Sequence, residues 1–260
     1  MVKEITSTSN PLIKRILLLQ EKSKLRKEEN IFIIDGWKET QMAIVNGFEI
    51  ETILYRKGFG LNFDELTNEE TIEISEEVFD KIAVRGNTSK VVAIAKQKTH
   101  ELENLKFINQ KNPLILVLDA IEKPGNLGAI LRTADATGVD AVICSDTQTD
   151  IYNPNVIRSS VGCVFTQQIA VCNKEECLKF LQENKISVYT TSLKAAKNYL
   201  ECDYKNATAF VFGTEATGVD EFWETHSTQN IIIPMLGQND SLNVSSSVAI
   251  VLFEALRQRV

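Results

Sequence analysis

The 260-residue sequence has few of the residues that build disulfide-bonded or metal-dependent proteins. Its five cysteines are an odd number, are absent from the first 143 residues and form no C-x-x-C pair, which excludes a disulfide framework and a cysteine-based zinc site. The two histidines, His100 and His226, lie far apart in the sequence, so we expect neither a structural metal nor histidine acid–base chemistry. This cysteine usage fits a reducing compartment, and we expect a cytoplasmic protein.

Long apolar runs are also missing. No stretch approaches the roughly 18–20 apolar residues that cross a bilayer. The first 15 residues lack the apolar core and small-residue cleavage site of a secretory signal. Hydrophobic residues nevertheless make up 43% of the chain, so we expect a globular protein with one large or two modest domains and no membrane partner.

The net charge of −7 argues against nucleic-acid binding at face value, but the distribution of charge matters more than its total. Residues 11–27 carry a net charge of +5, whereas residues 101–260 carry −6. Taken alone, a Lys/Arg-rich helix is most often a solvated face, and the alternative is a contact with RNA phosphates. The candidate RNA contacts are Lys14, Arg15, Lys22, Lys24, Arg26 and Lys27.

Hydrophobic periodicity predicts two α/β units separated by the polar stretch 99–113, the best linker candidate. In the first unit we predict helices at 9–28, 37–46 and 76–83, and strands at 31–34, 50–55, 71–74 and 91–95. In the second we predict strands at 114–118, 141–144, 166–171, 187–191, 209–212 and 230–233, and helices near 127–137, 175–183 and 244–257. This alternation implies a mostly parallel sheet covered by helices.

Ligands of parallel α/β sheets bind beyond the carboxyl ends of the strands, so the segments that follow strands are the candidate sites. The dinucleotide fingerprint, the P-loop and the nucleophile elbow are absent. Three other segments stand out: residues 118–134, 210–218 and 232–248. Alone, Asn126 is explained as a helix cap and Arg132 as a surface cation. The third segment has more small polar residues at a helix start than one cap needs, which suggests that they bind something else.

Taken in this order, the three segments resemble the signature motifs of the SpoU/TrmH family, which belongs to the SPOUT class of RNA ribose 2′-O-methyltransferases. Residues 152–162 are similar to a further family segment, N-P-x-x-x-R-x-S-x-G. Residues 10–14 and 32–36 resemble the opening of the ribosomal-protein-like substrate-binding domain that many members carry, although residues 85–90 depart from its usual pattern. The residues that match the three signature motifs are Asn126, Gly128 and Arg132, then Gly213, Glu215 and Gly218, then 233–235 and 241–245.

The resemblance implies an α/β fold in which a C-terminal parallel-sheet domain, residues 114–260, contains a deep trefoil knot. A smaller N-terminal α/β domain, residues 1–98, would bind the RNA substrate. The resemblance also implies S-adenosylmethionine as the cofactor, held largely through backbone groups. The implied cofactor-binding residues are Thr191, Gly213, Ile233 and Leu242, with Ser192 as an alternative to Thr191.

The resemblance assigns Arg132 the task of activating the ribose 2′-hydroxyl. Because an arginine side chain resists deprotonation, we expect it to position the hydroxyl and the adjoining phosphate and to stabilise developing negative charge. Asn126 and Asn243 would orient the arginine or the ribose. Glu215 would fix Arg132 or another group of the site, and Ser241 would be a further donor.

The implied partners are RNA and a second copy of the chain. A separate N-terminal domain favours ribosomal RNA over tRNA as the substrate. The helices near 156–163 and 244–256 carry more apolar residues than one sheet face needs, which indicates a homodimer through the C-terminal domain. The rival hypothesis is a non-catalytic RNA-binding protein, which explains the basic helix but not the three filled motifs.

Overall fold

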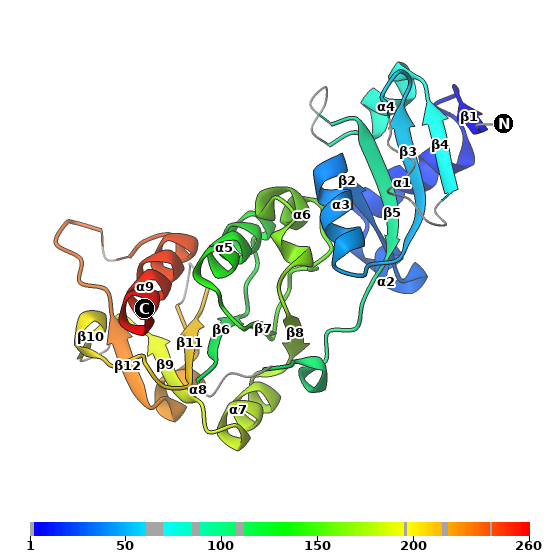
Figure 1. Ribbon diagram of the computed structural model, residues 1–260. Helices are drawn as coiled ribbons and strands as arrows, with labels where there is room; N and C mark the ends of the chain where they lie inside the picture. The colour runs from blue at the N-terminus through cyan, green and yellow to red at the C-terminus, as the bar shows by residue number, and fades with distance from the viewer. Residues whose placement is uncertain are drawn as a thin grey trace. The chain divides into compact units, whose positions relative to one another are not determined.

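The computed structural model describes residues 3–60, 70–84, 89–107, 112–194, 197–214, 218–239 and 241–260. The chain forms two compact units (Figure 1). The first comprises Met1–Thr99 and Asp150–Thr166, and the second comprises His100–Thr149 and Gln167–Val260. No helix in the part of the chain that the structure describes is long and apolar enough to cross a membrane.

The first unit is built on a five-stranded mixed sheet of order β1-β4-β3-β5-β2. Strand β3 pairs parallel with β4 and antiparallel with β5, which in turn pairs antiparallel with β2. The apolar faces of α1 and α4 cover one side of the sheet, where Ile13, Ile16 and Phe79 are fully buried. The strands are β1 (Lys3–Ile5), β2 (Ile31–Asp35), β3 (Ile50–Arg56), β4 (Glu70–Ile74) and β5 (Val91–Lys96). The helices are α1 (Pro11–Glu21), α2 (Ser23–Glu29), α3 (Trp37–Val45) and α4 (Glu76–Ile82).

The helix predicted over 9–28 is two helices, α1 and α2, separated at Lys22, whose backbone is extended. The break places Arg26 in the interior, with 1% of its surface exposed. Its Nη1 donates to the carbonyl of Leu19 at 2.5 Å, and its Nη2 forms an ion pair with the carboxylate of Asp150 at 2.6 Å. A buried guanidinium that satisfies a helix-end carbonyl and a carboxylate cannot contact phosphate, so the prediction that Arg26 binds RNA is wrong.

The segment Asp150–Thr166 connects β7 to β8 of the second unit along the chain but packs within the first unit. It contains helix α6 (Pro154–Ser160). The ring of Tyr152 stacks on Phe32 of β2 with the centroids 4.3 Å apart, and the ring of Phe165 lies 5.9 Å from Phe32. The first unit therefore includes a piece of the range that the sequence assigned to the C-terminal domain.

The second unit is a seven-stranded sheet of order β10-β12-β9-β11-β6-β7-β8, and every strand pair in it is parallel. Figure 1 shows α5 and α9 along one face of this sheet and α7 and α8 on the other. The strands are β6 (Leu114–Asp119), β7 (Ala141–Ser145), β8 (Ile169–Cys172), β9 (Ser187–Thr191), β10 (Lys197–Asn198), β11 (Thr208–Phe212) and β12 (Gln229–Ile232). The helices are α5 (Pro124–Thr137), α7 (Lys174–Glu183), α8 (Glu221–His226) and α9 (Val244–Arg259).

Part of the predicted linker belongs to this second unit. The side chains of Leu102, Leu105 and Phe107 pack against the core between the sheet and helices α7 and α8. The backbone of His100 accepts a hydrogen bond from Val171 of β8 at 2.7 Å. The predicted linker 99–113 is therefore not a free connection over its first half, because residues 100–107 belong to the second unit.

Candidate active site

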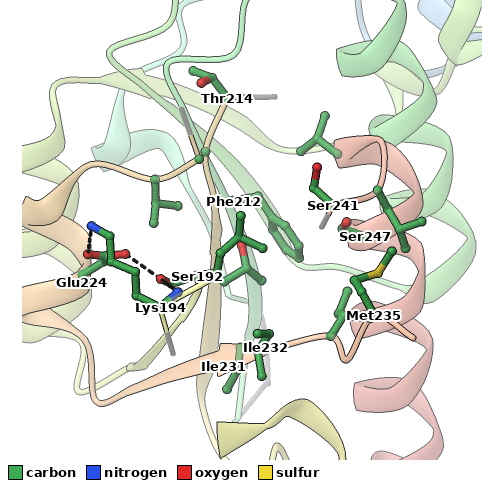
Figure 2. Close-up of a pocket in the computed structure, with 18 residues that line it drawn as sticks. Ser192, Lys194, Phe212, Thr214, Glu224, Ile231, Ile232, Met235, Ser241 and Ser247 are labelled. Carbon is green, nitrogen blue, oxygen red and sulfur yellow. Dashed lines mark hydrogen bonds and ion pairs between the residues drawn. The ribbon is translucent and has the colours of Figure 1, made fainter. Parts of the chain in front are cut away.

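A cavity of about 470 Å³ lies at the carboxyl ends of β9, β11 and β12 (Figure 2). The loop before α9 and the first turns of that helix complete its wall, through residues 241–247. This is where parallel α/β sheets bind ligands, and the volume is that of a small-molecule site.

The glycine-rich turn after β11 forms one side of the cavity. Thr214 and Gly218 exchange two backbone hydrogen bonds, of 2.9 and 3.1 Å. The backbone of Gly213 lies close to that of Gly218, since a Cβ atom at Gly213 would be 2.0 Å from the carbonyl oxygen of Gly218. Only glycine at position 213 therefore permits the close approach of the two backbone segments.

The structure brings together all four predicted cofactor-binding residues, Thr191, Gly213, Ile233 and Leu242, as lining of this cavity. Ser241, predicted as a further donor, lines it too. Phe212, Ile231, Met235 and Val244 make much of the remaining wall apolar. Such a wall can hold a flat ring between apolar side chains while backbone groups bond its polar edges.

One carboxylate and one ammonium group also face this cavity, and sequence reasoning missed both. The Glu224 carboxylate accepts a hydrogen bond from the Ser192 hydroxyl at 2.5 Å and lies 3.6 Å from the ammonium of Lys194 (Figure 2). Glu224 is the fourth residue of α8, a short helix that the periodicity did not reveal. No motif contains Glu224, and only the packing of α8 beside β9 brings it to the cavity.

Beside the cavity wall, the loop before α9 meets α5 through a pair of asparagines. The Nδ2 of Asn243 donates to Oδ1 of Asn126 at 3.3 Å. Asn243 is also the N-cap of α9, because its Oδ1 accepts from the Ser245 backbone at 3.0 Å and from the Ser245 hydroxyl at 2.6 Å. Asn126 is not a cap: α5 begins at Pro124, two residues before it, after the N-cap Lys123. The first and third motifs thus meet through these two side chains.

Arg132 lies six residues after Asn126 on α5, about 9 Å further along the helix axis. Its side chain is exposed and makes no hydrogen bond or ion pair with any residue that the structure describes. The structure therefore leaves its guanidinium open to solvent rather than joined to the asparagine pair. The predicted partner Glu215 lies outside the described residues.

The segment 11–29 carries less uncompensated positive charge than the count of its basic residues implied. Arg15 is paired with Glu29, and Lys24 lies 3.7 Å from Glu28, so two predicted RNA contacts already have acidic partners. The predicted contacts that are exposed and form no ion pair with any described residue are Lys14, Lys22 and Lys27.

A buried carboxylate at the end of β6 is not part of the cavity. Asp119 is 5% exposed and accepts a hydrogen bond from the Ser145 hydroxyl of β7 at 2.8 Å. Burial raises the pKa of Asp119 above its usual range. This carboxylate joins the ends of two neighbouring strands.

Comparison with known proteins matches both parts of the chain to family models. A model described as the SpoU rRNA Methylase family matches residues 113–253, and one described as the MRM3-like substrate binding domain matches residues 10–93. These matches confirm the resemblance seen in the motifs and in the N-terminal opening.

Several similar proteins are named as 23S rRNA methyltransferases, and some of them match most of this chain. The 23S rRNA (guanosine(2553)-2′-O)-methyltransferase RlmP of Bacillus subtilis is 28% identical over 97% of this chain and 98% of that protein. The 23S rRNA (guanosine-2′-O-)-methyltransferase RlmB of Haemophilus influenzae is 34% identical over 88% of this chain and 89% of that protein. The crystal structure of an AdoMet-bound rRNA methyltransferase from Sinorhizobium meliloti covers 100% of this chain and 99% of its own, with 31% identity and a TM-score of 0.91.

The family model covers more than half of the chain, and residues of all three signature motifs gather at or beside one cavity. The chain belongs to the SpoU rRNA Methylase family.

Proposed function

We propose that this protein transfers a methyl group from S-adenosylmethionine to a ribose 2′-hydroxyl of 23S-type ribosomal RNA. The observation that carries the proposal is the cavity lined by Thr191, Gly213, Ile233 and Leu242, with the Asn126–Asn243 pair beside it. Two relatives that match 97% and 88% of this chain are named as 23S rRNA 2′-O-methyltransferases, and the S. meliloti neighbour binds AdoMet. tRNA remains the alternative substrate.

The residues of the cavity fit this cofactor. Ile231, Ile233 and Leu242 supply apolar surface for the faces of an adenine ring, and the backbone around Gly213 approaches closely because no Cβ intervenes. Backbone N–H and C=O groups suit the polar edges of the ring. When bound, the cofactor supplies a methyl group on a sulfonium, which needs no further activation.

The side chains of this protein must align the ribose and help its hydroxyl proton to leave. Arg132 holds the 2′-hydroxyl and the adjoining phosphate in its planar fork and stabilises the negative charge that develops on the oxygen. Asn126 and Asn243, already joined to each other, orient the ribose. Glu215 fixes Arg132 by a charge-assisted hydrogen bond, and Ser241 supplies a further donor.

RNA binding falls to the N-terminal domain, residues 1–98, and cofactor binding to residues 114–260. Lys14, Lys22 and Lys27 are the cations that contact RNA phosphates, since they are exposed and form no ion pair with described residues. Such contacts make binding salt-sensitive. A fragment of residues 100–260 lacks α1 and α2 and should lose most RNA affinity.

A homodimer in the cytoplasm, with a trefoil knot in each C-terminal domain, completes the proposal. The support for dimerisation is α9, where Phe253 is 52% exposed. The helix near 156–163, which the sequence also suggested as a dimer contact, gives no such support. Val156 and Ile157 of this helix, α6, are buried in the first unit. Light scattering that gives the monomer mass at micromolar concentration would contradict the dimer.

The test of the proposal is single-turnover transfer of labelled methyl, with cofactor and ribosomal RNA saturating, in the wild type and in Arg132→Lys. Lysine keeps the charge but loses the planar fork, so the rate should fall at least about 10²-fold while cofactor affinity barely changes. Alkali-resistant dinucleotides in the product RNA identify the ribose 2′-oxygen as the acceptor. A rate within threefold of wild type would remove Arg132 from the reaction.

A further inference from the structure

We propose that Glu224 binds one ribose hydroxyl of the cofactor and so acts as a specificity-determining residue of the cavity, an inference that rests on the proposed function. Among the described residues that line the cavity, Glu224 is the sole carboxylate. Its side chain keeps 18% of its surface exposed, and Figure 2 shows it beside Ser192 and Lys194 at the edge of the cavity. A carboxylate in this position accepts hydrogen bonds from whatever donor the ligand presents.

The contacts that Glu224 already makes favour a neutral donor. One carboxylate oxygen accepts the Ser192 hydroxyl at 2.5 Å, and the other lies 3.6 Å from the ammonium of Lys194. Each carboxylate oxygen has two lone pairs, so both retain acceptor capacity for a ligand. Because Lys194 already balances the negative charge, a second ammonium at this place would compete with it, whereas a hydroxyl would not.

The position of Glu224 also separates it from the reacting groups. Glu224 and Ser192 lie on the side of the cavity formed by α8 and the end of β9, whereas Ser241 and Ser247 lie on the side formed by α9 (Figure 2). The Asn126–Asn243 pair is at the start of α9. Glu224 therefore faces a part of the cofactor that does not react, where a carboxylate bonded to a sugar hydroxyl gives recognition, as in dinucleotide-binding folds.

The experiment is calorimetric binding of S-adenosylhomocysteine and its 2′-deoxy and 3′-deoxy analogues to the wild-type protein and to Glu224→Gln. A hydrogen bond to a charged group predicts that Glu224→Gln weakens S-adenosylhomocysteine binding about tenfold. The analogue that lacks the contacted hydroxyl should bind both proteins within twofold, because the two losses share one interaction. Glu221→Gln, an exposed carboxylate on the same helix outside the cavity, is the control and should bind as wild type.

5′-Methylthioadenosine distinguishes the ribose from the amino-acid part of the cofactor, because it keeps the sugar and lacks the amino group. The proposal predicts the same tenfold loss for this ligand in Glu224→Gln. A loss that disappears with 5′-methylthioadenosine, or one that is equal for all deoxy analogues, would overturn it. Glu224→Asp, which withdraws the carboxylate by one methylene, should show the same coupling and serves if the glutamine variant folds poorly. Failure of wild-type protein to bind S-adenosylhomocysteine would contradict the proposed function itself.

Discussion

The backbone contact at Gly213 gives the most quantitative prediction for the cavity. In Gly213→Ala the new Cβ would lie 2.0 Å from the carbonyl oxygen of Gly218 and 2.4 Å from the backbone nitrogen of Val219. Real Cβ atoms do not approach other atoms closer than 3.0 Å, and both neighbours are backbone. The turn must therefore move by about 1 Å, since a close-packed interior leaves no alternative.

A shift of this size breaks the two hydrogen bonds that close the turn between Thr214 and Gly218. Each backbone hydrogen bond contributes about 1 kcal/mol, so the displaced turn, which the cofactor needs in its native position, loses about 2 kcal/mol of stabilising contacts. That difference corresponds to about a thirtyfold weaker affinity for S-adenosylhomocysteine.

Isothermal titration measures this affinity directly, with circular dichroism as a check of folding. The matched control is Gly237→Ala, since a Cβ at that loop position meets no atom within 4 Å. It should bind within twofold of wild type. If Gly213→Ala binds within threefold of wild type, the close approach of the two backbone segments does not shape the cofactor site.

Three further predictions concern charges and caps. Asp150→Asn leaves the buried Arg26 without its counter-ion and should lower the free energy of unfolding, measured by urea titration, by about 3–5 kcal/mol. Lys24→Met, which breaks the exposed pair with Glu28, should change it by less than about 0.5 kcal/mol. A hydrogen bond from Arg257 lowers the pKa of Glu254 to about 2. The Glu254 carboxylate therefore stabilises the fold above its unfolded pKa, and this stabilisation is lost as the pH falls toward 2. Denaturation of Glu254→Gln should show a destabilised protein at pH 7 and a nearly unchanged stability at pH 2. Asn243→Ser keeps an N-cap but loses the Asn126 contact, so stability should hold while the methyl-transfer rate falls; an unchanged rate would limit Asn243 to capping.

The elements with strong periodicity were predicted well from the sequence. Apolar runs gave β6 and β11 within a residue or two, and the predicted α3 and α7 match within one residue at each end. Both strands lie in the middle of a parallel sheet, where every residue is buried and the sequence is apolar except for Asp119 at the end of β6 and Thr208 at the start of β11. Helix α8 and strand β10 were missed because they are short and their few buried residues set no period.

The differences arose where a side chain's partner is distant in sequence. Nothing near Arg26 indicates that it is buried, because its carboxylate partner Asp150 is 124 residues away. Similarly, residues 166–168 resemble a strand, but β8 begins at Ile169 after the 3-10 turn η4 (Cys163–Phe165). The local sequence pattern indicates the periodicity and the propensity of a segment. Which distant residues pair with each other depends on the topology of the fold.

The candidate site was predictable to the extent that it lies in motifs. The four candidate cofactor-binding residues came from the resemblance, and all four line the cavity; their contact with the cofactor stays a prediction. Glu224 could not be found this way, because it belongs to no motif and reaches the cavity only through the packing of α8. The role of Glu215 stays a prediction.

The most direct test of the central claim is a map of 2′-O-methyl nucleotides in ribosomal and transfer RNA from cells with and without this gene. We expect one 2′-O-methyl nucleotide of the large-subunit RNA to disappear on deletion. It should return when the wild-type gene is restored, but not when Arg132→Lys is restored. An unchanged ribosomal RNA map together with the loss of a tRNA 2′-O-methyl group would contradict the assignment of substrate, and no change in either RNA would contradict the proposed activity.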